Sequence, residues 1–487
     1  MAAWTPEHVG PRTRPNRKSP WATVEEQRAA LQQAVQAQLQ VLRSQLGVIV
    51  SRFAAIDDPR RAHSVQHPLP TVLLHGMLLF VFQFASRRKG NEGLSCPAMR
   101  AALAEVLPAC ESTPHTDTVD RLLQRIPADE IESVPRRHVR GLMRQGKLNH
   151  LKVQGRYVVA VDGTQKWSRS WPWAEEALRR CKPGSEEVQT YSAYALEATL
   201  VGPQGVRLPI STEFCANEPQ PPKSDEGVRA PSVERQKQDC EFKAFKRLAP
   251  RLKATLRRQP LLIVADGLYA NGPAMDICRT HGWDFMLVLR DGSLPLLWEE
   301  ANKLRKLEPG NIYHTRWGNR EQHFWWVNDL VHEFGHGQRI KVHLVVCEEI
   351  WTEFDRDNQP VSRKARFAWV SGSPLTAKNA VDRCNRAARH RWDIEEHILA
   401  EKHHGYQCSH AFSLDWNAMR GWHHLMQLAE LLNTLVLHNI HLWDDWVCRF
   451  GFAGTIDWLR TAYLSTTLDL SCLRALLTKP PQLRLVF

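Results

Sequence analysis

The chain has 487 residues, of which 43% are hydrophobic, and it carries a formal net charge of +12. A chain of this length and composition can bury a large core in several structural units, which excludes an intrinsically disordered protein. The positive charge predicts a polyanionic partner, and it favours nucleic acid over a membrane surface. The 11 cysteines include no C-x-x-C pair, which argues against a disulfide framework and favours a reducing compartment such as the cytoplasm.

The N-terminal part of the chain is expected to be helical after a short basic tail. Residues 1–20 are rich in Pro, Arg and Lys, and we expect them to be disordered. Residues 21–150 show helical periodicity and predict an all-helical domain. The longest apolar run, VLLHGMLLFVFQFA at 72–85, is too short to cross a bilayer and predicts a buried helix.

Strand-like sequence begins at residue 156. Between there and residue 216, three runs predict the strands of a meander: RYVVAVDGT, TYSAYALEATLV and VRLPISTEFCA. A helix that Pro250 kinks or breaks should follow. The runs PLLIVADGLYA and WDFMLVLR then predict two further strands.

The remainder of the chain predicts a second β-rich stretch and then helices. Residues 291–372 alternate aromatic and polar stretches, which indicates an inserted β-rich unit. From Thr376 a long helix is expected, and another long apolar helix follows YQCSHAFSLD. The tail to residue 487 should be mostly helical.

Two aspartates follow buried strands and precede glycines, in VVAVDGT and LIVADGL. Each Asp-Gly pair alone is typical of a turn. If the two strands are neighbours in one sheet, however, Asp162 and Asp266 project from the same edge. Oxygen ligands of this kind bind hard divalent cations, and two such ions can support phosphodiester cleavage. Glu395, on a helix that can pack beside these strand ends, is the candidate third carboxylate.

The segment RWDIEEHILAEK at 391–402 allows two interpretations. At 3.6 residues per turn, Arg391, Glu395 and Lys402 lie on one face of a helix. That face is either a solvated ion-paired surface or one wall of an active site. The two aspartates favour the active site.

These features together resemble the ribonuclease-H-like core of bacterial insertion-sequence DDE transposases. The resemblance rests on the order of strands and helices, on the segment WVSGSPLTAKNA, and on the Y-x2-R-x3-E-x6-K signature of one subgroup. Arg391, Glu395 and Lys402 match that signature in type and spacing, whereas Ala388 stands where the subgroup has Tyr. The fold class it implies is α/β, a ribonuclease-H-like mixed sheet with a β-rich insertion between helical N- and C-terminal regions.

The resemblance also implies an activity, a site and partners. The activity is metal-dependent cleavage at transposon ends and strand transfer into target DNA, with Asp162, Asp266 and Glu395 holding two Mg²⁺ or Mn²⁺ ions. Arg391 and Lys402 are expected to bind DNA phosphate. A transposase-derived DNA-binding protein without catalytic activity is the alternative, since the signature Tyr is missing.

The expected partners are double-stranded DNA, both transposon ends and target, and a second copy of the chain in a synaptic complex, with no membrane. We expect a bacterial, cytoplasmic and nucleoid-associated protein. The domain assignment is DNA binding for 21–150, a ribonuclease-H-like core for 151–290 and 373–412, the insertion for 291–372, and dimerisation or synapsis for 413–487.

Some family members stack a flipped base on a tryptophan of the insertion. Trp369 is the first candidate for this role here, followed by Trp325 and Trp326. Stacking of a base on an aromatic ring contributes about 1–3 kcal/mol, which makes the role plausible. The alternative is that each ring covers the core of the β-rich unit.

Two histidine-containing segments suggest competing metal sites. HEFGH at 332–336 matches the H-E-x-x-H pattern of zinc peptidases, but that chemistry requires a helix. The glycines and strand-like flanks predict a hairpin turn instead. KHHGYQCSH at 402–410 lacks a standard zinc-ligand spacing, so its histidines are expected to lie at a helix end near DNA or solvent.

Overall fold

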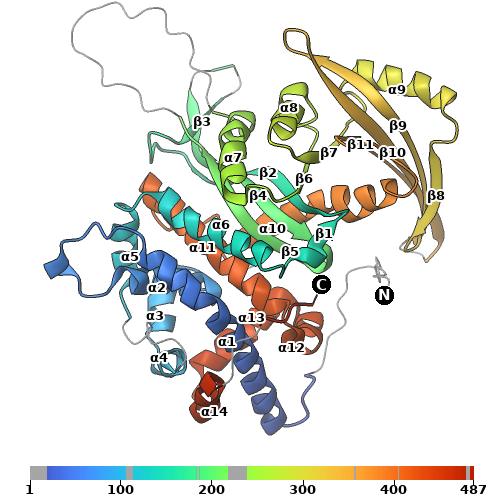
Figure 1. The fold of residues 1–487 in the computed structure, drawn as a ribbon. Coiled ribbons are helices and arrows are strands. Elements are labelled where there is room, and N and C mark those ends of the chain that lie inside the picture. The colour runs from blue at the N-terminus through green and yellow to red at the C-terminus, as the bar shows by residue number, and fades with distance from the viewer. Residues whose placement is uncertain are drawn as a thin grey trace, which may run out of the picture.

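The computed structural model is an α/β structure in which helices from both ends of the chain pack together beside a mixed sheet (Figure 1). It describes residues 19–105, 113–182, 184–185, 187–217, 239–355, 358–403, 405–478 and 483–486. The tail predicted at 1–20 lies outside the described residues, apart from its last two.

The N-terminal part is helical, as its periodicity predicts. Its helices are α1 (Val24–Ala54), α2 (Leu69–Val81), α3 (Arg87–Leu94), α4 (Pro97–Ala104), α5 (Thr116–Leu123) and α6 (Ala128–Arg144). Nearly every side chain of α2 is buried, as expected for the apolar run. Among the described helices, none combines the length and hydropathy that crossing a membrane would require.

Eleven described strands form one sheet, and its central strands are parallel. From edge to edge the order is β3-β4-β2-β6-β7-β11-β10-β9-β8, with β1 beside β2 and β5 beside β4. The pairs β2–β6 and β6–β7 are parallel, and the other pairs are antiparallel. The strands are β1 (Lys152–Val153), β2 (Arg156–Arg169), β3 (Leu178–Cys181), β4 (Val188–Gly202), β5 (Val206–Cys215), β6 (Leu261–Ala265), β7 (Asp284–Val288), β8 (Ile312–Trp317), β9 (Arg320–Phe334), β10 (Gln338–Phe354) and β11 (Pro360–Ser371).

Both faces of the central strands are covered, which explains their continuous apolar sequences. Along β2, Val159 and Val161 enter the large core shared with α1, α2 and α11 (Trp416–Leu437). The alternate residues Val158 and Ala160 enter a second core on the opposite face, beside α10 (Arg391–His403). Helices α7 (Glu241–Leu256), α8 (Gly272–Thr280) and α9 (Pro295–Leu307) connect the later strands, and α12 (Ile440–Leu442), α13 (Cys448–Leu464) and α14 (Leu470–Ala475) end the chain.

Three local predictions differ from the structure. Strand β2 continues to Arg169 instead of ending at the Asp-Gly pair, because β4 pairs with it beyond the point where β6 ends. Helix α7 continues through Pro250, which lies on its exposed face, where water can satisfy the carbonyl that loses its partner. The long helix expected from Thr376 is divided.

The division falls just before the signature segment. A π-helical turn at Asp382–Ala387 and a 3-10 turn at Ala388–His390 precede α10, and Ala387 departs from helical geometry with φ −126° and ψ −69°. Arg391, Glu395 and Lys402 all lie within α10, so their predicted spacing on one helix face is retained.

The strands of residues 291–372 belong to the same sheet as the central strands. Strand β11 pairs with β7 through Val288, Leu287 and Met286, and β10, β9 and β8 extend the sheet beyond it. The β-rich segment is therefore joined to the rest of the protein by continuous backbone hydrogen bonding.

Candidate active site

The pairing register of β2 and β6 places Asp162 beside Asp266. The two strands are parallel, and their last paired residues are Val161 and Ala265. The next residue on each strand is the aspartate. Neighbouring strands lie about 5 Å apart, so the two side chains start from adjacent positions at the same edge. Their side chains are 20% and 28% exposed, which leaves both carboxylates open to a small ligand.

The ionisation of Asp162 reflects this crowding. Burial raises the pKa of Asp162 to about 6, and the carboxylates of Asp266 and Glu241 act in the same direction. The Gly163 N–H and the guanidinium of Arg391 oppose the rise in the pKa only in part. Acidic groups that disfavour each other's charge are typical of sites that hold a cation.

Helix α10 presents Arg391 and Glu395 to Asp162. The Arg391 Nη1 atom lies 2.7 Å from Glu395 Oε1 and 3.7 Å from Asp162 Oδ2. These two carboxylate oxygens are therefore no farther apart than the sum of the two distances. Arg391 is buried, with 6% of its side chain exposed. The Arg391 end of this helix face is thus buried against the aspartates, whereas Glu395, which is 45% exposed, lies at the border with solvent.

The three carboxylates lie at one edge without forming a single coordination sphere. Among the described residues, the groups of three whose ligand atoms all lie within 4.8 Å do not include this trio. Arg391 stands between Asp162 and Glu395, and Arg290 lies 3.4 Å from Asp266 Oδ2. Two guanidinium groups therefore provide the positive charge at this edge.

Lys402 lies farther along α10, beside the continuation of β2. Its Nζ donates a 2.6 Å hydrogen bond to Oγ1 of Thr164, two residues beyond Asp162. Ala388 has no polar group to offer, and it is buried in the core beneath α10. The structure thus places Lys402, but not Ala388, beside the carboxylate edge.

The family comparison concerns the N-terminal helices. Residues 50–139 match a family model described as DDE_Tnp_1-associated. This match indicates a DDE-type transposase family. It covers the region from the end of α1 into α6 and ends before β2, so it carries no information about the three carboxylates. Among curated proteins, none matches the chain.

The three tryptophans predicted to stack a flipped base are all buried. Trp325, Trp326 and Trp369 are 1%, 4% and 3% exposed. Trp325 is covered by Arg305, whose guanidinium carbon lies 4.2 Å from the ring centroid. The exposed tryptophan near the carboxylates is Trp392, which is 56% exposed and lies 4.3 Å from the Arg391 guanidinium.

Glu241 is a component of this edge that the sequence did not reveal. It is the first residue of α7, and it accepts a hydrogen bond from the hydroxyl of Tyr194. A Cβ atom at Gly163 would lie only 2.5 Å from the Glu241 carboxyl carbon. The glycine after Asp162 is therefore needed for the approach of Glu241, and this was the one available sequence signal.

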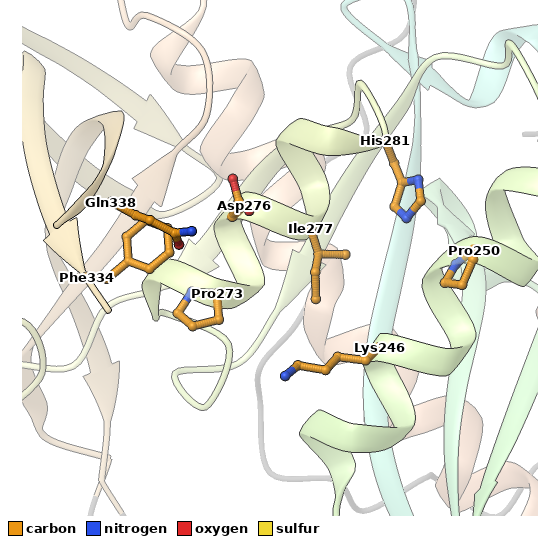
Figure 2. Close-up of a pocket in the computed structure, with 8 residues that line it drawn as sticks. All are labelled: Lys246, Pro250, Pro273, Asp276, Ile277, His281, Phe334 and Gln338. Atoms are coloured by element: carbon orange, nitrogen blue, oxygen red, sulfur yellow. The ribbon is translucent and has the colours of Figure 1, made fainter. Parts of the chain in front are cut away.

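The zinc-peptidase alternative fails on secondary structure. His332 lies in β9 and His336 in the turn that leads to β10, with Gly335 and Gly337 at positive φ on either side of His336. The hairpin prediction is confirmed, and the two histidines are not on one helix face. A pocket of 360 Å³ at the turn end of this hairpin, against α7 and α8, is lined by residues such as Lys246 and Phe334 and includes none of the three carboxylates (Figure 2).

Substituting Asp162 with asparagine is expected to stabilise the protein at neutral pH when no metal is bound. Because the folded-state pKa is raised to about 6, the aspartate destabilises the fold progressively as the pH rises from about 4 to about 6, and fully above that. Asparagine cannot ionise, so a gain of about 2 kcal/mol is expected at pH 7.5 and almost none at pH 4. Urea denaturation in EDTA at both pH values measures this. Equal stability of the two proteins at pH 7.5 would contradict the raised pKa.

Proposed function

We propose that this protein is a DNA transposase that cleaves transposon ends in a metal-dependent reaction and transfers strands into target DNA. The observation that carries the proposal is the register of β2 and β6, which sets Asp162 beside Asp266, with Arg391 and Glu395 of α10 against them. Parallel central strands with an antiparallel β2–β4–β5 meander and a helix over one face are consistent with a ribonuclease-H-like core. The match of the N-terminal helices to the DDE_Tnp_1-associated family supports a relation to DDE-type transposases in general.

The acidic edge has the donor chemistry for two Mg²⁺ or Mn²⁺ ions. Asp162, Asp266 and Glu395 would hold them, and the raised pKa of Asp162 supports this, since a divalent cation would relieve the repulsion that burial and Asp266 create. When bound, such ions activate the attacking oxygen and stabilise the leaving oxygen of a phosphodiester. For a metal ion to bind, the Glu395 carboxylate would have to leave its ion pair with Arg391 and coordinate the cation instead.

Arg391 and Lys402 would then bind the DNA backbone. The Arg391 guanidinium offers a planar fork for a phosphate, and the Lys402 ammonium offers a point charge on the same side of β2. Ala388 cannot contribute a hydroxyl. His390 does not replace it freely, because its Nδ1 lies 2.5 Å from Asp393. Phosphate binding would therefore rest on Arg391 and Lys402, with the exposed ring of Trp392 adjacent.

The proposed partners are double-stranded DNA and a second copy of the chain, in a bacterial cytoplasm at the nucleoid. The net charge of +12 supports the first. We propose DNA binding for residues 21–150 and dimerisation for 413–487. Helix α11 is buried against α2 and α6, so a dimer contact would use the helices after it.

The test is nicking of supercoiled plasmid that carries the coding segment with its native flanking DNA. We expect nicking with Mg²⁺ or Mn²⁺ and none with EDTA. Glu395→Gln should reduce the nicking rate at least about a hundredfold, because an amide is a weak ligand for a hard cation. The matched control is Glu396→Gln, since Glu396 is 70% exposed and makes only a 3.8 Å contact with Arg207. If Glu395→Gln nicks the plasmid at the full rate, the Arg391–Glu395 pair of α10 is only a structural salt bridge.

A catalytically silent, DNA-binding derivative is the second candidate. Two observations favour it: Ala388 in the signature position, and the ion pair that occupies Glu395. Binding of the flanking DNA without nicking in either metal, by the wild-type protein, would select this alternative.

A further inference from the structure

A second cluster of ionisable side chains is buried where α10 crosses between the sheet and α11. It is separate from the carboxylate edge, because its members project from the opposite side of α10 and from the middle of α11. All are at most 5% exposed: Glu197, His397, Glu401, Cys408, His423 and Glu430. Strand β4, helix α10, the loop after it and helix α11 each contribute.

Two of the three carboxylates in this cluster lack hydrogen bonds. Both carboxylate oxygens of Glu197 and both of Glu401 are buried without a hydrogen-bond partner, and so is Nε2 of His423. Their nearest imidazole contact is His397 Nε2, which lies 3.3 Å from Glu197 Oε2 and 3.5 Å from Glu401 Oε1 without making a hydrogen bond to either. Buried carboxylates that are compensated this weakly are costly, which indicates that a further positive centre belongs beside them.

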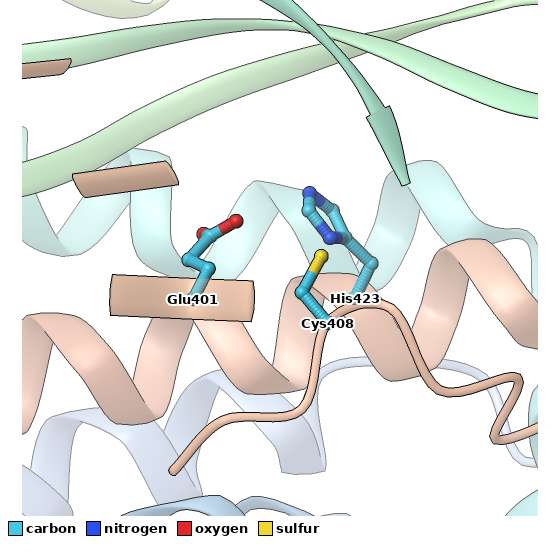
Figure 3. Close-up of side chains that lie close together, drawn as sticks. All are labelled: Glu401, Cys408 and His423. Carbon is cyan, nitrogen blue, oxygen red and sulfur yellow. The ribbon is translucent and has the colours of Figure 1, made fainter. Parts of the chain in front are cut away.

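The donor atoms are close enough to share one ion. Glu401, Cys408 and His423 each offer a ligand atom, and these three atoms lie within 4.8 Å of one another (Figure 3). Glu197 is the nearest further donor, with its Oε1 3.6 Å from His423 Nε2. In a tetrahedral zinc site the metal–ligand distances are about 2.0–2.3 Å, so the ligand atoms lie somewhat closer to one another than the 4.8 Å limit found here. Only small side-chain movements are therefore needed.

We propose that Glu401, Cys408 and His423 bind one divalent transition-metal ion, with Glu197 completing the site. A thiol, an imidazole and carboxylates form a mixed donor set that zinc prefers over magnesium. This site goes beyond the proposed transposase activity, because none of its ligands belongs to the carboxylate edge.

Lys166 is the competing positive group. Its Nζ lies 3.1 Å from Cys408 Sγ and 3.4 Å from His423 Nδ1. In the described part of the chain, however, it makes no ion pair with a carboxylate, so it does not satisfy Glu197 or Glu401. Cys408 would bind metal as a thiolate, so its thiol proton would pass to solvent as the metal binds.

The imidazole of His397 is already engaged by neighbouring carboxylates. Its Nδ1 lies 2.8 Å from Glu430 and its Nε2 lies 3.3 Å from Glu197. We therefore do not include His397 among the ligands. A divalent ion held by Glu401, Cys408 and His423 would bring positive charge next to Glu197 and Glu401.

The proposed ion would fix the helix that carries the signature residues. Glu401 lies on α10 next to Lys402 and on the opposite side from Glu395, and His423 lies on α11. Metal would therefore connect α10 to α11. Through Glu197 it would also connect both helices to β4, at the residue that pairs with Asp162. Its role is to position α10 and not to take part in the reaction.

The test measures metal in the full-length protein in the Asp162→Ala background, which removes a ligand of the acidic edge. The protein is incubated with excess Zn²⁺ under reducing conditions and then separated from free metal by gel filtration. We expect about one zinc ion per chain, measured by inductively coupled plasma mass spectrometry. Cys408→Ala should lose it. The matched control, Cys278→Ala, removes a cysteine of equal burial on α8 and should retain it.

Cobalt gives an independent measurement on the protein with its cysteines intact. Co²⁺ bound at this site should show a thiolate-to-cobalt absorption band, absent from Cys408→Ala and present in Cys278→Ala. A folded protein that binds no metal and shows no such band would overturn the proposal. The charge of the buried carboxylates would then have to be balanced by Lys166 and by a proton held within the cluster. Metal that persists unchanged in Cys408→Ala would also overturn it.

Discussion

Replacement of Asp162 by alanine is expected to lower metal-dependent nicking by about a thousandfold or more, with little loss of DNA binding. Asp162 is the carboxylate that connects the other two, since it lies next to Asp266 by strand register and shares Arg391 with Glu395. Without it, the proposed cations would lose the carboxylate that lies between their other two ligands. DNA affinity rests on many lysines and arginines over the surface, and one carboxylate contributes little to it.

The measurement is the initial nicking rate at saturating DNA, with binding followed separately by electrophoretic mobility shift. Asp276→Ala is a suitable control, because this aspartate lies on α8 and pairs only with Arg279 within its own helix. Retention of more than about a tenth of the wild-type rate by Asp162→Ala would exclude Asp162 as a metal ligand. Loss of DNA binding together with loss of nicking would indicate a folding defect in Asp162→Ala. Circular dichroism would detect such a defect, and Asp162→Asn, which is expected to fold stably, would then replace Asp162→Ala in the assay.

Much of this edge could be predicted from sequence because its signals are local. The runs VVAV and LIVA are apolar on both alternations, so strands buried on both faces were predictable. The i,i+4 spacing of Arg391 and Glu395 fixed their common helix face. What the sequence does not contain is the register between strands about a hundred residues apart, which depends on the packing of the whole sheet.

Residues were missed or misjudged where burial depends on distant elements. Trp325 and Trp326 are successive residues of β9, so they point to opposite faces, and both are buried because both faces are covered. His397 and Glu401 look like part of a solvated helix face in sequence, yet α11 covers them completely. Glu241 enters the carboxylate edge because α7 begins there, a placement that no local pattern encodes.

Arg383→Met is expected to destabilise the protein by about 3–5 kcal/mol, the largest effect on stability that the structure predicts for a single side chain. Arg383 and Asp284 are 2% and 3% exposed, and Nη1 and Nη2 lie 2.7 Å and 3.1 Å from the two carboxylate oxygens. Methionine fills similar volume, so the main effect is the loss of the buried charged partner. Asp284 keeps hydrogen bonds from Ser373 and the Phe285 N–H, and a 3.5 Å contact with the half-exposed Arg156. Urea denaturation at pH 7, followed by tryptophan fluorescence, measures the loss.

The pH dependence of this loss has a definite sign. Burial raises the pKa of Asp284, but the hydrogen bonds from Arg383 and Ser373 outweigh it, so the folded-state pKa is lowered. A lowered pKa contributes stability above the unfolded value of about 4, and this stability disappears as the pH falls through the folded value. The difference between wild type and Arg383→Met should therefore shrink below about pH 4. Lys303→Met is the control, because the Lys303–Glu299 pair is 72% and 60% exposed, so solvent screens it and its removal should change stability little at any pH. Equal losses in the two variants would show that the Asp284–Arg383 pair does not hold β7 to the segment before α10.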